Sequence, residues 1–327
     1  MQSRSAFPTS SEPAAALRGR ALPKAATDEV SIRFQAMACD AEILIQGGKL
    51  RSGSALLEAA VKEVRRIEAK YSRYRSDSVV SRINAAAGSG DAVGVDRETA
   101  GLLRFADQLY DLSEGLFDIT SGVLRRAWDF RSGTLPVAES IDAILPRIGW
   151  QHVRQGMRAD WRRIRLPLPG MELDFGGFGK EYAADRAATI LQAAGVRHGF
   201  VIIGGDIRVI GPRTDGDGWT LGIQHPRHAV GTVAGVAMSH GALATSGDYE
   251  RFMEIDGVRY CHILNPRTGQ PVRHWQSVSV AAPVCVAAGA MTTIAMLMEQ
   301  RAEQFLREQE AAYIAIDMSG RLIRKAL

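Results

Sequence analysis

The chain has 327 residues, 46% of them hydrophobic, and a formal net charge of +4 at pH 7. This length and composition suffice for a large buried core, and no uninterrupted apolar run approaches the roughly 20 residues of a membrane-spanning helix. Acidic and basic residues are interleaved, with no basic stripe between aromatic residues, which argues against nucleic-acid binding.

The three cysteines, Cys39, Cys261 and Cys285, show no Cys-x-x-Cys spacing, so the sequence predicts neither a disulfide framework nor a zinc cluster. Residues 1–30 are rich in Ser, Pro, Ala and Arg, and they lack both the apolar segment of a secretory signal and a cysteine for lipid attachment. We expect a disordered tail here, followed by a single domain over residues 31–327. These features favour a cytoplasmic location, with the periplasm as the alternative.

The first half of the chain predicts a strand or hairpin followed by helices. Residues 31–46 alternate apolar and polar side chains, and residues 54–72 place apolar side chains on one helical face. Asp96 is positioned to cap a second helix, and residues 124–130 predict a third, short helix. Residues 131–170 predict turns and edge strands.

A glycine-rich segment over residues 172–185 reads ELDFGGFGKEYAAD and predicts the end of a strand, a turn and a helix that ends at Gly195. Glycines let the backbone approach a bulky group closely, and free N–H groups at a helix entrance favour an anion such as phosphate. Lys180 adds a positive charge at the same place. An ordinary strand-to-helix corner that needs glycine only for close packing is the alternative.

The second half of the chain is rich in predicted hairpins. A buried strand over residues 198–206 ends in a second glycine pair and Asp206, so two glycine–aspartate junctions predict two walls of one cleft. The Asp256-Gly257 turn predicts a hairpin whose second strand carries His262. The remaining predicted elements are strands at 219–223, 231–239 and 275–282, a tight loop at 243–250, a helix at 283–299 and a hairpin at 312–317 and 322–325. Because helices alternate with several hairpins, the sequence predicts an α+β fold with mixed or antiparallel sheets.

Three polar positions leave a structural and a functional interpretation open. Asp118 lies in an apolar run, so its carboxylate either caps the local turn or accepts hydrogen bonds from a base or ribose. His262 is either a hydrogen-bonded strand histidine or a general base, because its usual pKa suits proton transfer near neutrality. The segment around Tyr74 is either a solvated helix end or a surface on which an aromatic ring stacks against a planar ligand.

Five short motifs occur in a defined order along the chain. They are Tyr71-Ser-Arg-Tyr74 with Asp77-Ser78 and Asn84, Gly115-Leu-Phe-Asp-Ile-Thr120, Leu173-Asp-Phe-Gly-Gly-Phe-Gly-Lys180, Thr245-Ser-Gly-Asp-Tyr-Glu-Arg251 and Tyr260-Cys-His-Ile-Leu-Asn-Pro-Arg-Thr-Gly269. In this order and at these separations the motifs resemble those of the ApbE family of FAD:protein FMN transferases. The resemblance runs from about Phe34 to the end of the chain, and the ordered combination is far more specific than any single motif.

The resemblance implies two lobes around a central FAD cleft and a specific transfer reaction. Such enzymes cleave the pyrophosphate of FAD, join FMN through a phosphoester to a Thr or Ser of a target protein, and release AMP with help from a divalent metal, usually Mg²⁺. By resemblance, the residues in contact with FAD are Met37, Tyr74, Leu116, Phe117, Asp118, Asp174, Lys180, His262 and Ile263. Lys180 would reach the phosphates, and His262 would act as the base on the incoming hydroxyl.

Two positions depart from the family pattern. Met37-Ala-Cys39 stands where the family usually has Met-Gly-Thr, and Gly289-Ala-Met-Thr-Thr293 stands where it usually has Asp-Ala-x-x-Thr. Glycine therefore replaces the one carboxylate ligand of the metal, which leaves Gly177 through its carbonyl, Thr292 and Thr293 as oxygen donors. Mg²⁺ can keep several waters and bind substrate phosphates, so the departure predicts weaker rather than abolished binding.

The departure at position 289 keeps other functions open. A flavin carrier would bind FAD and leave it intact, whereas an FAD pyrophosphatase would release FMN and AMP by using water as the nucleophile. A pocket that serves another nucleotide would not be stabilised by FAD. The transferase remains the leading hypothesis because the other motifs are all present.

Overall fold

The computed structural model describes residues 29–47, 53–154, 161–228 and 230–326. The expected N-terminal tail lies outside the described residues, except for Glu29 and Val30, which belong to the first strand. The assignment of the remainder to a single domain stays a prediction. No helix in the described ranges is long and apolar enough to cross a membrane.

The centre of the fold is an eight-stranded sheet in which each neighbouring pair of strands is antiparallel. Its strands, in spatial order, are β1 (Glu29–Ala36), β2 (Cys39–Gln46), β5 (His198–Ile203), β6 (Asp206–Gly211), β9 (Gly241–Gly247), β12 (Trp275–Ala282), β13 (Ala312–Asp317) and β14 (Leu322–Lys325). Three two-stranded sheets accompany it: β3 (Val93–Gly94) with β4 (Arg163–Ile164), β7 (Trp219–Gln224) with β8 (Thr232–Met238), and β10 (Phe252–Ile255) with β11 (Val258–Cys261). The predicted α+β fold with antiparallel sheets is confirmed.

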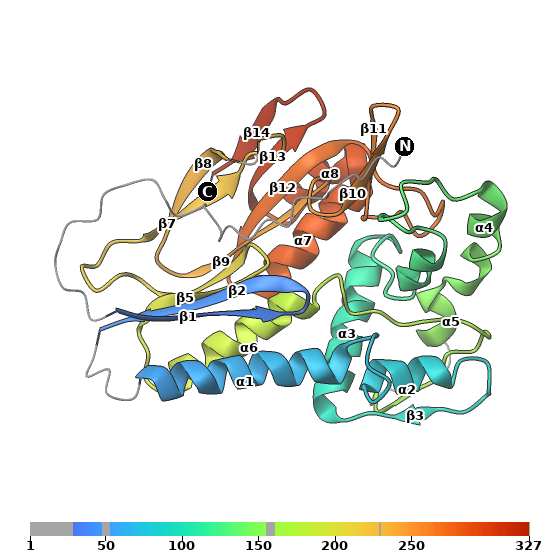
Figure 1. Ribbon diagram of the computed structural model, residues 1–327, viewed down its shortest axis with the longest axis horizontal. Coiled ribbons are helices and arrows are strands. Elements are labelled where there is room, and N and C mark those ends of the chain that lie inside the picture. Colours follow the sequence, from blue (N-terminus) through green and yellow to red (C-terminus); the bar gives the residue numbers. More distant parts are fainter. Residues whose placement is uncertain (1–28, 48–52, 155–160, 229, 327) are drawn as a thin grey trace, which may run out of the picture.

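The two faces of the large sheet pack against different layers (Figure 1). Successive strand residues point to opposite faces, so Ile43 and Val201, which are paired, join the core under the helices. Their neighbours Leu44 and Phe200 join a separate cluster with β7 and β8. The helices of the first layer are α1 (Gly53–Tyr71), α6 (Gly179–Ala193), α7 (Cys285–Met298) and α8 (Ala302–Glu308). This alternation fixes the register of the strands, since a slip of one residue would turn each side chain towards the opposite core.

A second group of elements, most of them short, packs at one end of this layer, on the right in Figure 1. It contains α2 (Val79–Ala85), α3 (Arg97–Leu112), α4 (Ala138–Asp142), α5 (Trp150–Arg154) and the 3-10 segments η3 (Ser121–Arg126) and η4 (Leu145–Arg147), while a third, η5 (Glu299–Arg301), precedes α8. Asp96 caps α3 as predicted, because its carboxylate accepts the backbone N–H of Thr99 at 2.9 Å. The helices α4 and α5 lie where turns and edge strands were expected, and the short helix expected at 124–130 is the 3-10 turn at 121–126.

Two further differences have clear physical reasons. The residues directly before the glycine-rich turn do not form the expected strand. The side-chain amide of Asn84 bonds to both the N–H and the carbonyl of Leu173, at 2.7 and 3.0 Å, and so takes the place of a partner strand. The segment expected to be a loop at 243–250 is mostly β9, an interior strand bonded by β6 on one side and β12 on the other. Its Gly, Ser and Thr residues favour a loop by composition, but the two neighbouring strands override that preference.

Candidate functional site

The two glycine-rich junctions predicted from the sequence meet at Lys180. Helix α6 begins at Gly179, whose N–H donates to the carbonyl of Phe175 at 2.7 Å, and Lys180 follows in the first turn. Its ammonium group bonds to Glu181 at 2.7 Å and to Asp206, the first residue of β6. Between β5 and β6, Gly204 has a φ of +58°, and a Cβ there would lie 2.9 Å from the sulfur of Cys39. Glycine at this turn therefore allows the β5–β6 turn to approach the β1–β2 hairpin.

We call the cluster of Lys180, Glu181 and Asp206 the junction. It places two buried carboxylates around one ammonium group. Asp206 is 1% exposed and also accepts the backbone N–H of Thr245 at 3.0 Å. Burial alone would lower the pKa of Lys180, but the Asp206 and Glu181 carboxylates raise it well above its usual value. Burial raises the pKa of Glu181 to about 7, against the opposing effect of Lys180. The pair of carboxylates therefore carries more negative charge than Lys180 can balance when both are ionised.

Glu181 is the residue of this junction that the sequence did not single out. It is 3% exposed, and its Oε2 atom has no hydrogen-bond partner among the residues that the structure describes. A Cβ at Gly289 on α7 would lie only 2.6 Å from its Cγ and 2.7 Å from its Oε1. An acidic residue in the first turn of a helix is common, because it complements the helix dipole, so nothing in the sequence marked Glu181 as unusual.

The hydroxyl groups expected to bind metal cluster between α7 and β9. Thr292 is fully buried and donates to the carbonyl of Gly289 at 2.9 Å, and its oxygen lies 2.8 Å from that of Ser246. The hydroxyl of Thr293 lies 3.4 Å from the same Ser246 oxygen. Gly177 lies in the turn before α6, where a Cβ would meet the ring of Phe117 at 2.9 Å. No group of three or more His, Cys, Asp or Glu side chains in the described part of the chain is arranged to hold a metal ion.

His262 is held by the backbone carbonyl of Arg251, the residue that precedes β10. It follows β11 rather than lying within it, and its N–H and its Nδ1 bond to the carbonyl of Arg251 at 2.9 and 3.2 Å. A carbonyl only accepts, so Nδ1 carries the proton and Nε2 is left as a base. Burial, followed by the charge of Arg251 and more weakly that of Lys180, lowers the pKa of His262 to about 4. The ring keeps an exposed surface where solvent weakens these charge effects, but both charges act in the same direction, so His262 is neutral at pH 7.

Tyr74 and Asp174 belong to a second group of predicted site residues, and Arg73 bonds to both of them. Arg73 pairs with Asp174, donates to the Tyr74 hydroxyl at 2.8 Å, and lies 5.0 Å from the centre of the Tyr74 ring. Asp174 also accepts the N–H of Gly176 at 2.9 Å. The Tyr74 side chain is nevertheless 79% exposed, so one ring is both anchored by Arg73 and open to solvent. Such a ring suits stacking against a planar ligand.

The turn at residues 115–120 is tightly packed. Leu116 and Phe117 are buried, and the Phe117 ring stacks on Phe178 with their centres 6.2 Å apart. Asp118 is buried as well, and its carboxylate accepts the N–H groups of Thr120 at 2.7 Å and Trp150 at 2.9 Å. Of the two interpretations of this carboxylate, the structural cap describes its hydrogen bonds.

The last two predicted FAD contacts lie beside the junction. Met37 has a φ of +54° in the tight turn between β1 and β2, and its N–H donates to Glu68 at 2.6 Å. Its carbonyl also lies 3.4 Å from the thiol of Cys39. Ile263 is buried next to His262 and accepts the N–H of Val272 at 3.0 Å.

The predicted site residues therefore form two groups joined by the segment 174–180. Lys180 lies close enough to His262 and Cys39 to influence their pKa values. In the other group, Asp174 donates its backbone N–H to Ile119 at 2.8 Å, which ties Tyr74 to the 115–120 turn.

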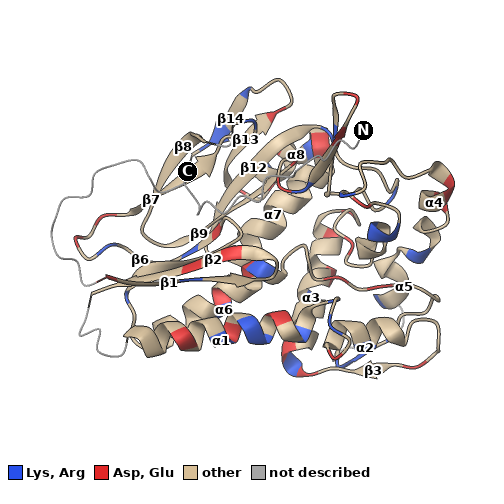
Figure 2. Ribbon diagram, in the orientation of Figure 1, with Lys and Arg blue, Asp and Glu red and all other residues tan. Residues whose placement is uncertain are grey.

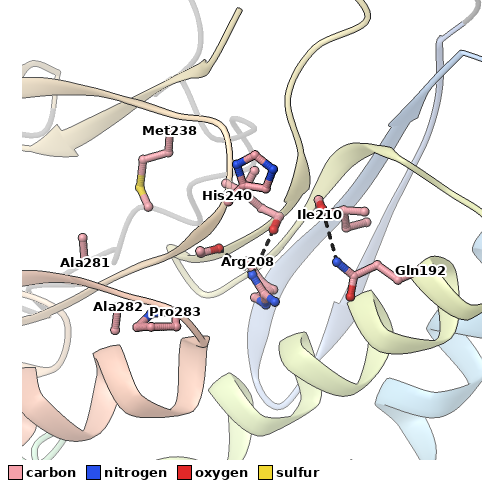
Figure 3. A pocket seen from close by; sticks show the side chains of 10 residues that line it. Gln192, Arg208, Ile210, Met238, His240, Ala281, Ala282 and Pro283 are labelled. Atoms are coloured by element: carbon pink, nitrogen blue, oxygen red, sulfur yellow. Dashed lines mark hydrogen bonds between the residues drawn. The ribbon is translucent and has the colours of Figure 1, made fainter. Parts of the chain in front are cut away.

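A cavity of about 490 Å³ at the far ends of β6 and β9 contains none of the predicted site residues (Figure 3). Its central cation, Arg208, donates to the carbonyls of Val209 and Gly241 at 3.0 and 2.9 Å and pairs with Asp185 at 3.1 Å. Because Asp185 already offsets the charge of Arg208 and two carbonyls bond to its Nη1, the cavity offers little for binding an anion. Figure 2 shows that acidic and basic residues are interspersed along α1. Arg66 on this helix pairs with Glu63 of α1 and with Glu98 of α3.

Comparison with known proteins identifies the family of the chain. Residues 29–316 match the model of the ApbE family. The FAD:protein FMN transferase of Salmonella typhimurium is 30% identical over 76% of this chain and 73% of that protein, and that of Vibrio cholerae is 32% identical over 76% and 74%. Among solved structures, the ApbE protein of Thermotoga maritima has a TM-score of 0.83 at 31% identity, over 91% of this chain and 97% of that one. The flavin transferase ApbE of Vibrio cholerae has a TM-score of 0.81 at 27% identity, over 92% and 97%. The family resemblance is confirmed, and the chain belongs to the ApbE family.

Proposed function

We propose that this protein transfers FMN from FAD to a Thr or Ser hydroxyl of an acceptor protein and releases AMP. The observation that carries the proposal is membership of a family whose relatives, about 30% identical over three quarters of the chain, are named FAD:protein FMN transferases. The arrangement of Lys180, Asp206 and His262 supports it, because phosphoryl transfer needs a charged phosphate held in place and a base for the nucleophile.

His262 is the proposed general base. Its Nδ1–H is held by the carbonyl of Arg251, which leaves Nε2 as the ring nitrogen that can accept a proton. The acceptor hydroxyl oxygen forms a bond to the phosphorus on the FMN side, and its proton passes to Nε2. The bond between that phosphorus and the bridging oxygen breaks, and the bridging oxygen leaves with AMP.

Lys180 is the proposed phosphate-binding group. Asp206 and Glu181 hold its ammonium group at the entrance of α6, where the helix dipole also favours an anion. Lys180 thereby positions the pyrophosphate and stabilises the charge that develops on the leaving group.

The second group of residues is proposed to bind the flavin end of FAD. The anchored and exposed ring of Tyr74 offers a stacking surface, and Asp174 offers a hydrogen-bond acceptor beside it. Leu116 and Phe117 would supply apolar contact. Because its carboxylate is occupied, Asp118 would act mainly by holding this turn in shape. Met37 and Ile263 would line the site nearer to His262.

The proposed metal ligands are the Gly177 carbonyl and the hydroxyls of Thr292 and Thr293. The Oε2 atom of Glu181, which has no hydrogen-bond partner in the described part of the chain, lies in the same region next to Gly289 and suits a small cation such as Mg²⁺. When bound, Mg²⁺ would neutralise charge on the pyrophosphate. The hydroxyl of Ser246 on β9 contacts the hydroxyls of Thr292 and Thr293 on α7, so these oxygens are already in place.

The test is to incubate the protein with FAD, with and without Mg²⁺, and with an acceptor domain of a protein that a named relative flavinylates. We expect flavin fluorescence on the acceptor after gel electrophoresis and release of AMP in equal amount. His262→Gln should reduce the transfer rate by about 10²–10⁴-fold while the Kd for FAD changes little. His240→Gln, which lies in the separate cavity, is the control and should transfer normally.

Other outcomes would assign a different function. Bound FAD that stays intact, with no fluorescence on any acceptor, would indicate a flavin carrier. AMP release without an acceptor would indicate an FAD pyrophosphatase. No FAD-dependent rise in melting temperature would exclude a flavin site altogether.

A further inference from the structure

Glu181 has an unused hydrogen-bonding oxygen in a buried position. Its Oε1 bonds to Lys180 at 2.7 Å, whereas its Oε2 has no partner in the described part of the chain. A buried polar atom without a partner is costly, so such atoms are rare and call for an explanation. A role as counter-ion of Lys180 explains only one of the two oxygens, and Asp206 already provides a carboxylate to that lysine.

The position of the carboxyl group supplies the second observation. Gly289 is buried on α7, and a Cβ at that position would lie 2.6 Å from Cγ, 2.8 Å from Cδ and 2.7 Å from Oε1 of Glu181. The carboxyl group of Glu181 on α6 therefore occupies the space into which a side chain at position 289 would project. A side chain at position 289 would force the Glu181 side chain to move, so only one of the two positions can place a carboxylate in this space.

We propose that Glu181 supplies the anionic ligand of the divalent cation from α6, in place of a carboxylate at position 289. This inference rests on the proposed function, because it concerns the cation that assists FMN transfer. In this arrangement Oε1 stays on Lys180 and Oε2 turns to the cation, beside the hydroxyls of Thr292 and Thr293. The substitution of glycine at position 289 then makes room for the ligand instead of removing it.

The charges of the junction favour the binding of a divalent cation. When Glu181 and Asp206 are both ionised, Lys180 balances only one of them, and one negative charge is left in a buried place. Mg²⁺ carries two positive charges and prefers oxygen ligands, so its arrival would leave the junction with a net positive charge. Such a site favours the pyrophosphate of FAD.

The test is metal binding measured without any acceptor protein. Mn²⁺ would be titrated into the full chain, with and without saturating FAD, and the free ion followed by electron paramagnetic resonance. Glu181→Gln keeps the shape of the side chain and should weaken Mn²⁺ binding by about tenfold or more. The double variant Glu181→Gly with Gly289→Asp moves the carboxylate to α7 and should restore binding to within a few fold.

Asp185→Asn is the matched control. Asp185 lies one turn further along α6, pairs with Arg208 and caps the start of α7 through Cys285, so its loss disturbs the same helix pair without removing the proposed ligand. We expect its Mn²⁺ affinity to equal that of the unmodified chain. Melting temperatures of all variants would verify that each is folded.

Two results would overturn the inference. Equal Mn²⁺ affinity in the unmodified chain and Glu181→Gln would make Glu181 only a partner of Lys180, and so would absence of Mn²⁺ binding even with FAD present. Failure of the proposed function gives a different pattern, since Mn²⁺ would bind through Glu181 while the acceptor domain stays unmodified.

Discussion

Asp118 and Glu181 are two buried carboxylates beside glycine-containing turns, and they differ in how their oxygens are used. At the 115–120 turn, both oxygens of Asp118 accept hydrogen bonds from the protein. At the start of α6, one oxygen of Glu181 has no partner in the ranges that the structure describes. Burial is similar, at 7% and 3% exposed, so burial alone does not distinguish a structural carboxylate from one available to a ligand.

The two regions also differ in charge balance. The 115–120 turn contains one carboxylate satisfied by neutral donors, whereas the α6 junction contains two carboxylates around Lys180. The turn can therefore hold its shape without a ligand. The junction has surplus negative charge and one carboxylate oxygen without a partner in the described part of the chain, which suits a region that binds a cation.

The largest effect is expected for Lys180→Met. This change leaves Glu181 and Asp206 buried without their shared cation, so the free energy of unfolding should fall by about 3 kcal/mol, and FMN transfer should be lost. Urea unfolding and the acceptor assay measure the two effects. Lys70→Met is the control, because Lys70 also pairs with two carboxylates, but those of Asp96 and Glu98 reach solvent, so about 1 kcal/mol is expected. Equal losses in both variants would mean that solvent screens the junction.

A smaller loss in the free energy of unfolding is expected for Asp118→Ala. The N–H groups of Thr120 and Trp150 would lose their acceptor in a buried place, which should lower the free energy of unfolding by about 2 kcal/mol. Asp118→Asn keeps one acceptor oxygen and should lose less than half as much. An unfolding free energy that stays unchanged while the Kd for FAD rises would assign the carboxylate to the ligand instead of the turn.

Tyr74→Ala should weaken FAD binding and leave stability almost unchanged. The ring is 79% exposed and makes few contacts that folding depends on, whereas stacking on a flavin contributes about 1 kcal/mol, or roughly fivefold in Kd. Fluorescence quenching of FAD on titration with protein would measure this change. Tyr74→Phe is the control and should retain the affinity, and a loss as large as that of Tyr74→Ala would assign the effect to the hydroxyl held by Arg73.

The smallest effect concerns the protonation of His262. Its pKa in the folded state is about 4, below the usual 6.5, so the unfolded chain binds the proton more tightly between these values. The contribution of His262 to stability is thus fully present above pH 6.5 and is lost as the pH falls towards 4. Because the exposed ring is partly solvated, solvent reduces the shift in pKa, and we expect a loss of stability below about 1 kcal/mol. A titration of its imidazole resonance by NMR near 6.5, with the resonance assigned through His262→Gln, would contradict this.

The sequence predicted the family and most of the elements because these follow from local patterns. The alternation in β1 and β2, the Asp96 cap of α3 and the Asp256-Gly257 turn are each encoded within a few neighbouring residues. The helix after the glycine-rich turn begins and ends close to its predicted limits for the same reason. Lys180 and His262 were singled out from motifs that are contiguous in the chain.

Interactions between distant segments decided what the sequence did not reveal. The strand β9 exists because β6 and β12 bond to both of its edges, and Asn84 replaces a partner strand at Leu173. The relation between Glu181 and Gly289 joins α6 to α7 across 108 positions of the chain (289 − 181), and no local pattern connects them. The sequence alone determined that position 289 lacks a carboxylate. Only the tertiary structure placed another carboxylate in the same space, because side-chain packing between two helices depends on the fold that brings them together.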